Sequence, residues 1–205
     1  MAQSVERILG KDEVASSILA SSSNVSRETL FLKKGDRIMY RTGHGIPMEF
    51  DNIPDALLSF YERTKHYDSN MSIIIGTDSQ SFNSVNDTKV ANVIAAVCDG
   101  HGGIFFYEVT HIGLLHSVKE KLQTETAESL MIAEKLVTAF ESDEKYSGMY
   151  LNCPISIHVD AGNSEKGKTR LLIPEIVGWV RNSGYDVCVK PESYVASCIA
   201  DKFSK

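Results

Sequence analysis

Three apolar runs between residues 72 and 113 have the composition of β-strands. They are SIIIGTDSQ (72–80), TKVANVIAAVCDG (88–100) and GGIFFYEVTHIG (102–113), each rich in β-branched or aromatic residues. A polar segment, SFNSVND, separates the first two runs, and a glycine-rich turn separates the last two. Because short turns join antiparallel neighbours, the pattern predicts an antiparallel meander of three strands.

The rest of the chain alternates helical and strand-like patterns. A long helix is predicted at roughly 122–141, with Thr124 as its cap. A strand, a helix, a strand and a helix follow at 155–160, 168–184, 185–190 and 193–203. Three strands followed by this alternation predict an α/β fold with a mixed five-stranded sheet flanked by helices.

The N-terminal part of the chain has a different character. Residues 1–50 are predicted to form an N-terminal extension, with a Ser-rich stretch and two short strands around the turn Lys34-Gly35-Asp36. Residues 51–71 read as an amphipathic helix that leads into the core, with Asn52 as cap and Pro54 in its first turn. The main domain is then predicted to span 72–205.

Composition narrows the class of protein. The chain has 205 residues, of which 42% are hydrophobic and 23% charged, as expected for one globular domain with an appendage. It contains neither an apolar run of membrane-spanning length nor the pattern of a signal peptide, so no membrane partner is expected. The four cysteines show no metal-binding spacing, which favours free thiols and a cytoplasmic location.

Four carboxylates occupy positions that suit a metal site. Asp78 and Asp160 end apolar strands, Glu125 lies in the first turns of the long helix, and Asp201 lies on the last helix. If the first and fourth strands are parallel neighbours, both aspartates stand at the ligand-binding edge of the sheet. Oxygen-only ligand sets select hard cations such as Mg²⁺ or Mn²⁺, and pairs of these ions catalyse phosphodiester cleavage.

The long helix offers a second glutamate, Glu128, which is the alternative to Glu125. At about 100° per residue, Glu125 falls near the edge of the predicted buried stripe, and Glu128 points roughly opposite. That stripe consists of Leu130, Ala133, Val137 and Phe140. Glu125 is therefore the preferred ligand.

Four segments resemble the YkuK-like family of ribonuclease H-like proteins, which is largely uncharacterised. The segments are IGTDSQ (75–80), EKL with TET (120–122 and 124–126), HVDAG (158–162) and KPESYVAS (190–197). The resemblance covers about residues 72–205 and implies a ribonuclease H-like sheet with a divalent-metal site. The wider superfamily carries acids on its first strand, first helix, fourth strand and last helix, which correspond to Asp78, Glu125, Asp160 and Asp201. The resemblance implies no particular substrate.

A phosphate-binding loop is a competing motif. Residues 162–169, GNSEKGKT, match G-x-x-x-x-G-K-[ST] between a strand and a helix. Only one clear strand follows, too little for a nucleotide hydrolase core. In a weaker form of the phosphate-loop hypothesis, Lys168 and Thr169 contact a substrate phosphate. Lys190 and Ser193, which precede the last helix, are further substrate-binding candidates.

The sequence therefore favours a divalent-metal-dependent nuclease with nucleic acid as its partner. The net charge of −6 opposes nucleic-acid binding, although bound cations would offset part of it locally. A non-catalytic ribonuclease H-like module that binds nucleic acid or a protein, through the N-terminal extension, is the alternative. Nucleotide binding at 162–169 is a third hypothesis.

Overall fold

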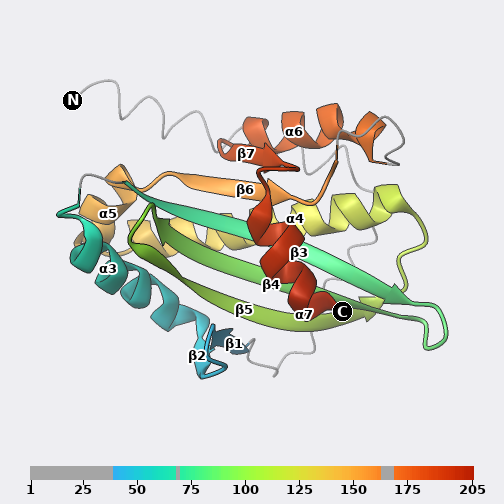
Figure 1. Ribbon diagram of the computed structural model, residues 1–205, viewed down its shortest axis with the longest axis horizontal. Coiled ribbons are helices and arrows are strands. Elements are labelled where there is room, and N and C mark those ends of the chain that lie inside the picture. The colour runs from blue at the N-terminus through green and yellow to red at the C-terminus, as the bar shows by residue number, and fades with distance from the viewer. Residues whose placement is uncertain (1–38, 68–69, 163–168) are drawn as a thin grey trace. The chain divides into compact units, whose positions relative to one another are not determined.

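Seven strands form one mixed sheet in the computed structural model, which describes residues 39–67, 70–162 and 169–205 (Figure 1). The strand order is β2-β1-β5-β4-β3-β6-β7. The strands are β1 (Met39–Thr42), β2 (Pro47–Glu49), β3 (Met71–Phe82), β4 (Asp87–Cys98), β5 (Gly102–Gly113), β6 (Ile155–Val159) and β7 (Asp186–Val189).

The five strands expected from the sequence are consecutive neighbours in this sheet, from β5 to the edge strand β7. β3, β4 and β5 pair as an antiparallel meander, and β6 lies parallel to β3 on its other side. β7 then pairs parallel to β6. Short turns produce the antiparallel pairs, whereas a helical crossover precedes each parallel strand.

The expected count of five strands was wrong, because the sheet has seven. β1 and β2 form a hairpin whose first strand pairs antiparallel with β5, so that Arg41 lies opposite Tyr107. The turn of this hairpin contains Gly45 at φ +80°, a backbone conformation that glycine adopts without strain. The predicted turn at Lys34-Gly35-Asp36 lies outside the described residues.

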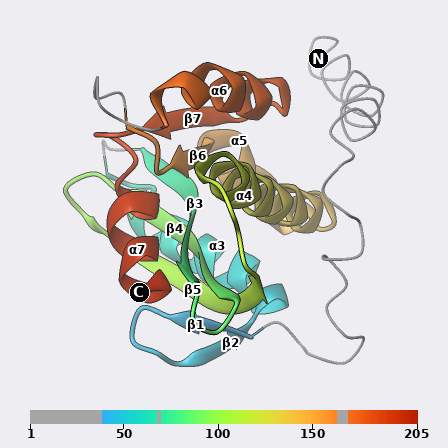
Figure 2. The same cartoon turned by 90° about the vertical axis from the view of Figure 1, so that its right-hand side faces the viewer.

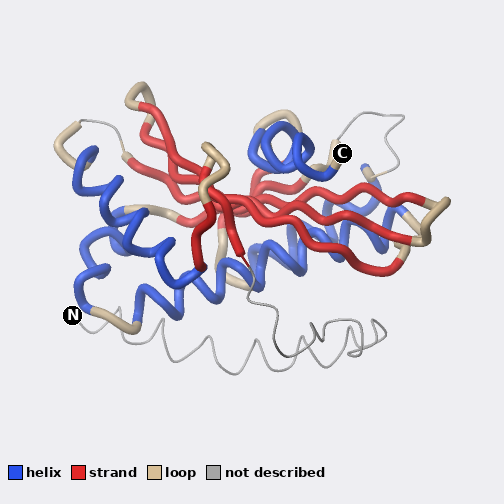
Figure 3. Tube along the Cα trace, turned by 90° about the horizontal axis from the view of Figure 1, so that it is seen from below, coloured by secondary structure: helices blue, strands red, loops and turns tan. Residues whose placement is uncertain are grey.

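Helices cover the two faces of the sheet unequally (Figures 2 and 3). One face packs into the larger core, which includes Ile73, Ile75 and Leu136. Its helices are α3 (Ile53–Thr64), α4 (Val118–Glu141), α5 (Ser147–Asn152) and α6 (Ile173–Asn182). On the other face, the helical elements of the described residues are the π-helical segment η5 (Val195–Ala200) and α7 (Asp201–Ser204), which together form the C-terminal helix.

Helix α4 begins four residues earlier than the sequence pattern suggested. Ser117, not Thr124, is its N-cap, and the Ser117 hydroxyl accepts a hydrogen bond from the backbone N–H of Glu120. The Glu120 carboxylate in turn accepts one from the backbone N–H of His116. This reciprocal arrangement resembles a capping box and places Lys121 within the first helical turn.

Short 3₁₀ turns complete the described elements. They are η2 (Phe50–Asn52), η3 (Glu144–Tyr146) and η4 (Arg170–Leu172), which lead into α3, α5 and α6 respectively. Among the described helices, none has the length and apolar character needed to cross a membrane.

Candidate functional site

Asp78 and Asp160 lie on neighbouring parallel strands. The register pairs Ile73 with Ile155 and Gly76 with His158, and its continuation brings Asp78 level with Asp160. β3 continues to Phe82, so Asp78 lies inside its strand rather than at the end, but the pairing with β6 stops just before it. The aspartates therefore lie where the two parallel strands separate, as expected for a ligand-binding edge.

Glu125 reaches the same edge from helix α4. Its Oε1 accepts hydrogen bonds from the backbone N–H and the hydroxyl of Ser79, both at 2.8 Å. The Nζ atom of Lys121, one turn earlier on the helix, lies 3.5 Å from Glu125 Oε1 and 3.5 Å from Asp78 Oδ1. Lys121 thus links the strand acid to the helix acid.

The Asp78 and Glu125 side chains are almost fully buried, with 4% of each residue exposed. Burial raises the pKa of Glu125 to about 8, against the opposing effect of the Lys121 charge. Burial also raises the pKa of Asp78, while the hydrogen bond from the Ser204 hydroxyl opposes that increase. Carboxyl groups held out of water in this way keep a proton unless positive charge lies nearby.

Asp160 and Asp201 complete the group. Asp160 Oδ1 lies 2.6 Å from Nζ of Lys190, and Asp201 Oδ2 lies 2.6 Å from Nζ of Lys205. The charges of Asp160 and Asp201 both contribute to the raised pKa of Asp78, so all three aspartates are close enough to interact. The fold therefore brings together the four acids that the sequence singled out.

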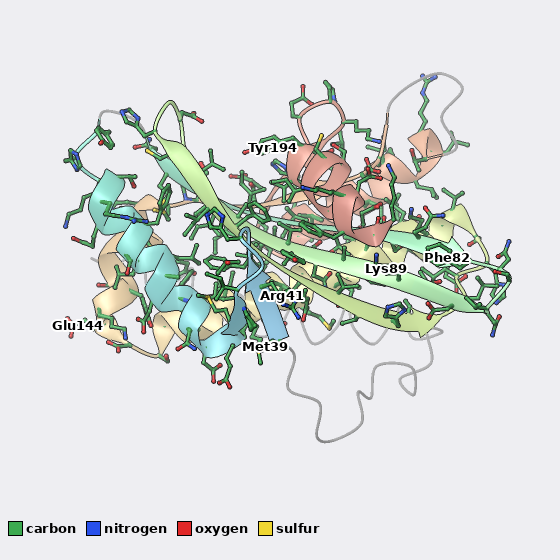
Figure 4. All side chains as sticks on the ribbon, turned by 60° about the horizontal axis from the view of Figure 1, so that its bottom comes forward. Met39, Arg41, Phe82, Lys89, Glu144 and Tyr194 are labelled. Atoms are coloured by element: carbon green, nitrogen blue, oxygen red, sulfur yellow. The ribbon has the colours of Figure 1, made fainter. Side chains whose placement is uncertain are left out.

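The C-terminal helix holds Asp201 and Ser204 over the sheet. Its first turn docks on β6, where the backbone N–H of Val195 donates to His158 Nδ1 and the Tyr194 ring meets the His158 ring edge-on. Burial lowers the pKa of His158 to about 4, so this ring is neutral near pH 7. At the other end, Lys89 of β4, which is labelled in Figure 4, donates a hydrogen bond from Nζ to the backbone carbonyl oxygen of Lys205.

Glu128, the alternative ligand, lies in a separate network. It accepts a hydrogen bond from Asn92, which also donates to Glu108, and Tyr40 donates to Glu108 as well. Burial raises the pKa of both glutamates. This network spans β1, β5, β4 and α4 inside the larger core, and no contact links it directly to Asp160 or Asp201 among the interactions of the described residues.

The residues that were expected to contact a substrate phosphate differ in their exposure and in their contacts. Lys190 is half-exposed beside Asp160. The Thr169 hydroxyl accepts a hydrogen bond from the backbone N–H of Gly162 and donates one to its carbonyl oxygen, so the two ends of the connection 162–169 are joined. Ser193 is fully buried. Lys168 and most of the phosphate-loop motif lie outside the described residues.

Four contributors to the site were not among the candidates from the sequence: Lys121, Lys205, Ser79 and Ser204. The pattern Ser117-Val118-Lys119-Glu120 carried the signal for Lys121, because a Ser followed three residues later by Glu marks a helix start. A helix beginning there puts Lys121 and Glu125 one turn apart on the same face. Ser79 and Ser204 had no comparable signal, since their contacts depend on tertiary packing.

The donor chemistry of the site is all oxygen. Among the described residues, no three Asp, Glu, His or Cys side chains surround a common point as a preformed metal site would. Instead, lysine ammonium groups lie against the acids. Asp160 Oδ1 is buried, and its close partner among the described residues is the half-exposed Lys190 ammonium at 2.6 Å.

Comparison with known proteins agrees with this architecture. A family model described as ribonuclease H-like matches residues 55–205. The chain is also 27% identical over 163 residues to the uncharacterized protein YkuK of Bacillus subtilis (strain 168), a match that covers 77% of this chain and 92% of YkuK. No solved structure gives a significant match. The resemblance to YkuK seen in the sequence is confirmed, and the chain belongs to the ribonuclease H-like family.

Proposed function

We propose that this protein is a divalent-metal-dependent nuclease that hydrolyses phosphodiester bonds in nucleic acid, with Mg²⁺ or Mn²⁺ as its cofactor. One observation carries the proposal: four carboxylates from β3, α4, the end of β6 and α7 meet at one edge of the sheet. Oxygen ligands in this number suit hard divalent cations rather than soft ones.

The residues present fit such a cation. The ligand atoms are all carboxylate oxygens, and lysine ammonium groups compensate the acids, of which the exposed Lys190 and Lys205 could give way to a cation. In a two-metal site, Asp78 and Asp160 would hold the two cations, and Glu125 and Asp201 would complete their ligands. Bound divalent cations activate water and stabilise the leaving 3′-oxygen in phosphodiester cleavage.

The protein's own groups would orient this site. Ser79 fixes one oxygen of Glu125 with two hydrogen bonds, and Ser204 fixes Asp78 from the C-terminal helix. Lys190, which is half-exposed, would move from Asp160 to a substrate phosphate when a cation takes its place. Thr169 would line the same edge, and buried Ser193 would act only through the loop that carries Lys190. Lys168, which lies outside the described residues, stays a candidate contact to a substrate phosphate.

Cleavage by an Asp78→Asn variant tests this proposal. Labelled single- and double-stranded RNA and DNA are incubated with Mn²⁺ and wild type, Asp78→Asn or Asp186→Asn, the last of which changes an exposed acid on β7. We expect cleavage by wild type and Asp186→Asn, and a loss of at least 100-fold in Asp78→Asn with unchanged circular dichroism. Full cleavage by a folded Asp78→Asn variant would exclude Asp78 from the chemistry.

A non-catalytic binding module is the second candidate. The observation in its favour is that lysines pair with the acids in the described residues, so the site is electrostatically compensated without any metal. This candidate predicts no Mn²⁺ affinity and no cleavage. It also predicts that binding to nucleic acid or to a protein partner survives replacement of Asp78 and Asp160 by Asn.

A further inference from the structure

Lys121 differs from the other two lysines of the site in what it contacts. Its ammonium lies 3.5 Å from an oxygen of Asp78 and 3.5 Å from an oxygen of Glu125, whereas the ion pairs of Lys190 and Lys205 join each of them to a single acid. A position between two buried carboxylates is also where a bridging divalent cation would bind. Lys121 therefore occupies a cation position.

Burial makes this position harder to vacate than the others. The side chain of Lys121 is 37% exposed, compared with 47% for Lys190 and 67% for Lys205. Lys121 is also fixed by the first turn of α4, one turn before Glu125, so the two residues are held in the same relative position. Lys190 and Lys205 can each move into solvent and leave a single acid. If Lys121 moved away, two buried carboxylates would lose their compensating charge.

We propose that Lys121 permanently takes the place of one of the two cations of a two-metal site, so that Glu125 pairs with the ammonium and the protein binds a single divalent cation, for which Asp78, Asp160 and Asp201 would be the ligands. The inference rests on the proposed nuclease function and deepens it by setting the number of cations. A second divalent cation between Asp78 and Glu125 would meet the Lys121 ammonium within a few Å and be repelled. The ammonium supplies the positive charge at that position instead.

Counting Mn²⁺ ions tests this inference without relying on activity. Calorimetric titration with MnCl₂ is carried out on wild type, Lys121→Met and Lys119→Met. Lys119 lies in the same helical turn, and its ion-pair partner among the described residues is the exposed Glu175, so its variant removes a lysine charge without touching the acids. We expect one Mn²⁺ per chain for wild type and Lys119→Met, and two for Lys121→Met.

A wild-type measurement covers the case in which Lys121→Met does not fold. Crystals of wild type soaked in MnCl₂ should show one anomalous peak beside Asp78 and Asp160, with Lys121 still between Asp78 and Glu125. Two peaks, or two Mn²⁺ per chain in solution, would overturn the inference and leave the nuclease proposal intact. One Mn²⁺ per chain in both wild type and a folded Lys121→Met would also overturn it. An absence of Mn²⁺ from wild type and Lys121→Met alike would overturn both proposals.

Discussion

Gly76 of β3 lies directly against the backbone of Ala196 in the C-terminal helix. A Cβ atom built on Gly76 would lie 2.7 Å from the backbone nitrogen of Ala196, closer than real Cβ atoms come to heavy atoms to which they are not bonded. The absence of a side chain at Gly76 therefore lets the segment that carries Asp201 and Ser204 approach the sheet, two residues before Asp78.

Gly76→Ala should weaken this docking. The added methyl meets backbone atoms, which cannot move aside as a side chain does, so we expect a loss of roughly 1–3 kcal/mol in the free energy of unfolding. Urea denaturation followed by circular dichroism measures it. Mn²⁺ affinity should fall as well, because Asp201 and Ser204 shift with the helix.

Gly178→Ala is the matched control for that change. Gly178 lies in helix α6, and a Cβ atom there meets nothing within 4 Å. Since alanine favours helix more than glycine does, this variant should gain up to about 1 kcal/mol. If Gly76→Ala were as stable as wild type, the close contact with Ala196 would not constrain the helix.

Glu108→Gln should stabilise the protein at alkaline pH. Burial raises the pKa of Glu108, so the folded state holds its proton more tightly than the unfolded chain does. That contribution to stability is present below the unfolded pKa and is lost as the pH rises through the folded pKa. The amide carbonyl can still accept the hydrogen bonds from Tyr40 and Asn92, and the charge that opposes Glu128 is gone.

We therefore expect Glu108→Gln to exceed wild type by about 1 kcal/mol at pH 8 and to match it more closely at pH 5. Urea denaturation at both pH values measures the difference. Glu134→Gln, which changes an exposed residue of the same fold, should show no such pH dependence. A Glu108→Gln variant that is less stable than wild type at pH 8 would contradict a raised pKa at this position.

Lys168→Ala distinguishes a phosphate-binding loop from a simple strand–helix connection. A nucleotide hydrolase would use this lysine for the nucleotide phosphates, so its removal would abolish ATP binding. We expect wild type to bind ATP no more tightly than Lys168→Ala does, because the aspartate before the motif already belongs to the acid site. A fluorescent ATP analogue titrated against both proteins measures this, and binding lost only in the variant would restore the nucleotide hypothesis.

Local sequence patterns were sufficient for the central fold. The apolar runs around Ile74 and Ile157 predicted strands, and the short turns between β3, β4 and β5 predicted their antiparallel order. These features depend on residues close together in the chain, which is why periodicity reveals them. The parallel pairing of β3 with β6 was only a condition in the sequence analysis, and the structure shows it.

The features that the sequence did not reveal depend on distant contacts or on the exact start of a helix. β1 joins the sheet through pairs such as Arg41 with Tyr107, which no local pattern specifies. The role of Lys121 was missed because the helix start was placed at Leu122, although the pattern from Ser117 to Glu120 marked the true start. The contact of Ser204 with Asp78 joins residues far apart in the chain and could be seen only in the folded protein.

The central claim is that the four acids form a divalent-cation site, and Mn²⁺ titration by calorimetry tests it most directly. The proteins are wild type, an Asp78→Asn/Asp160→Asn double variant and the Asp186→Asn control, each checked for folding by circular dichroism. The claim predicts Mn²⁺ binding by wild type and the control, and none by the folded double variant. Equal binding by all three proteins, or binding by none of them, would contradict it.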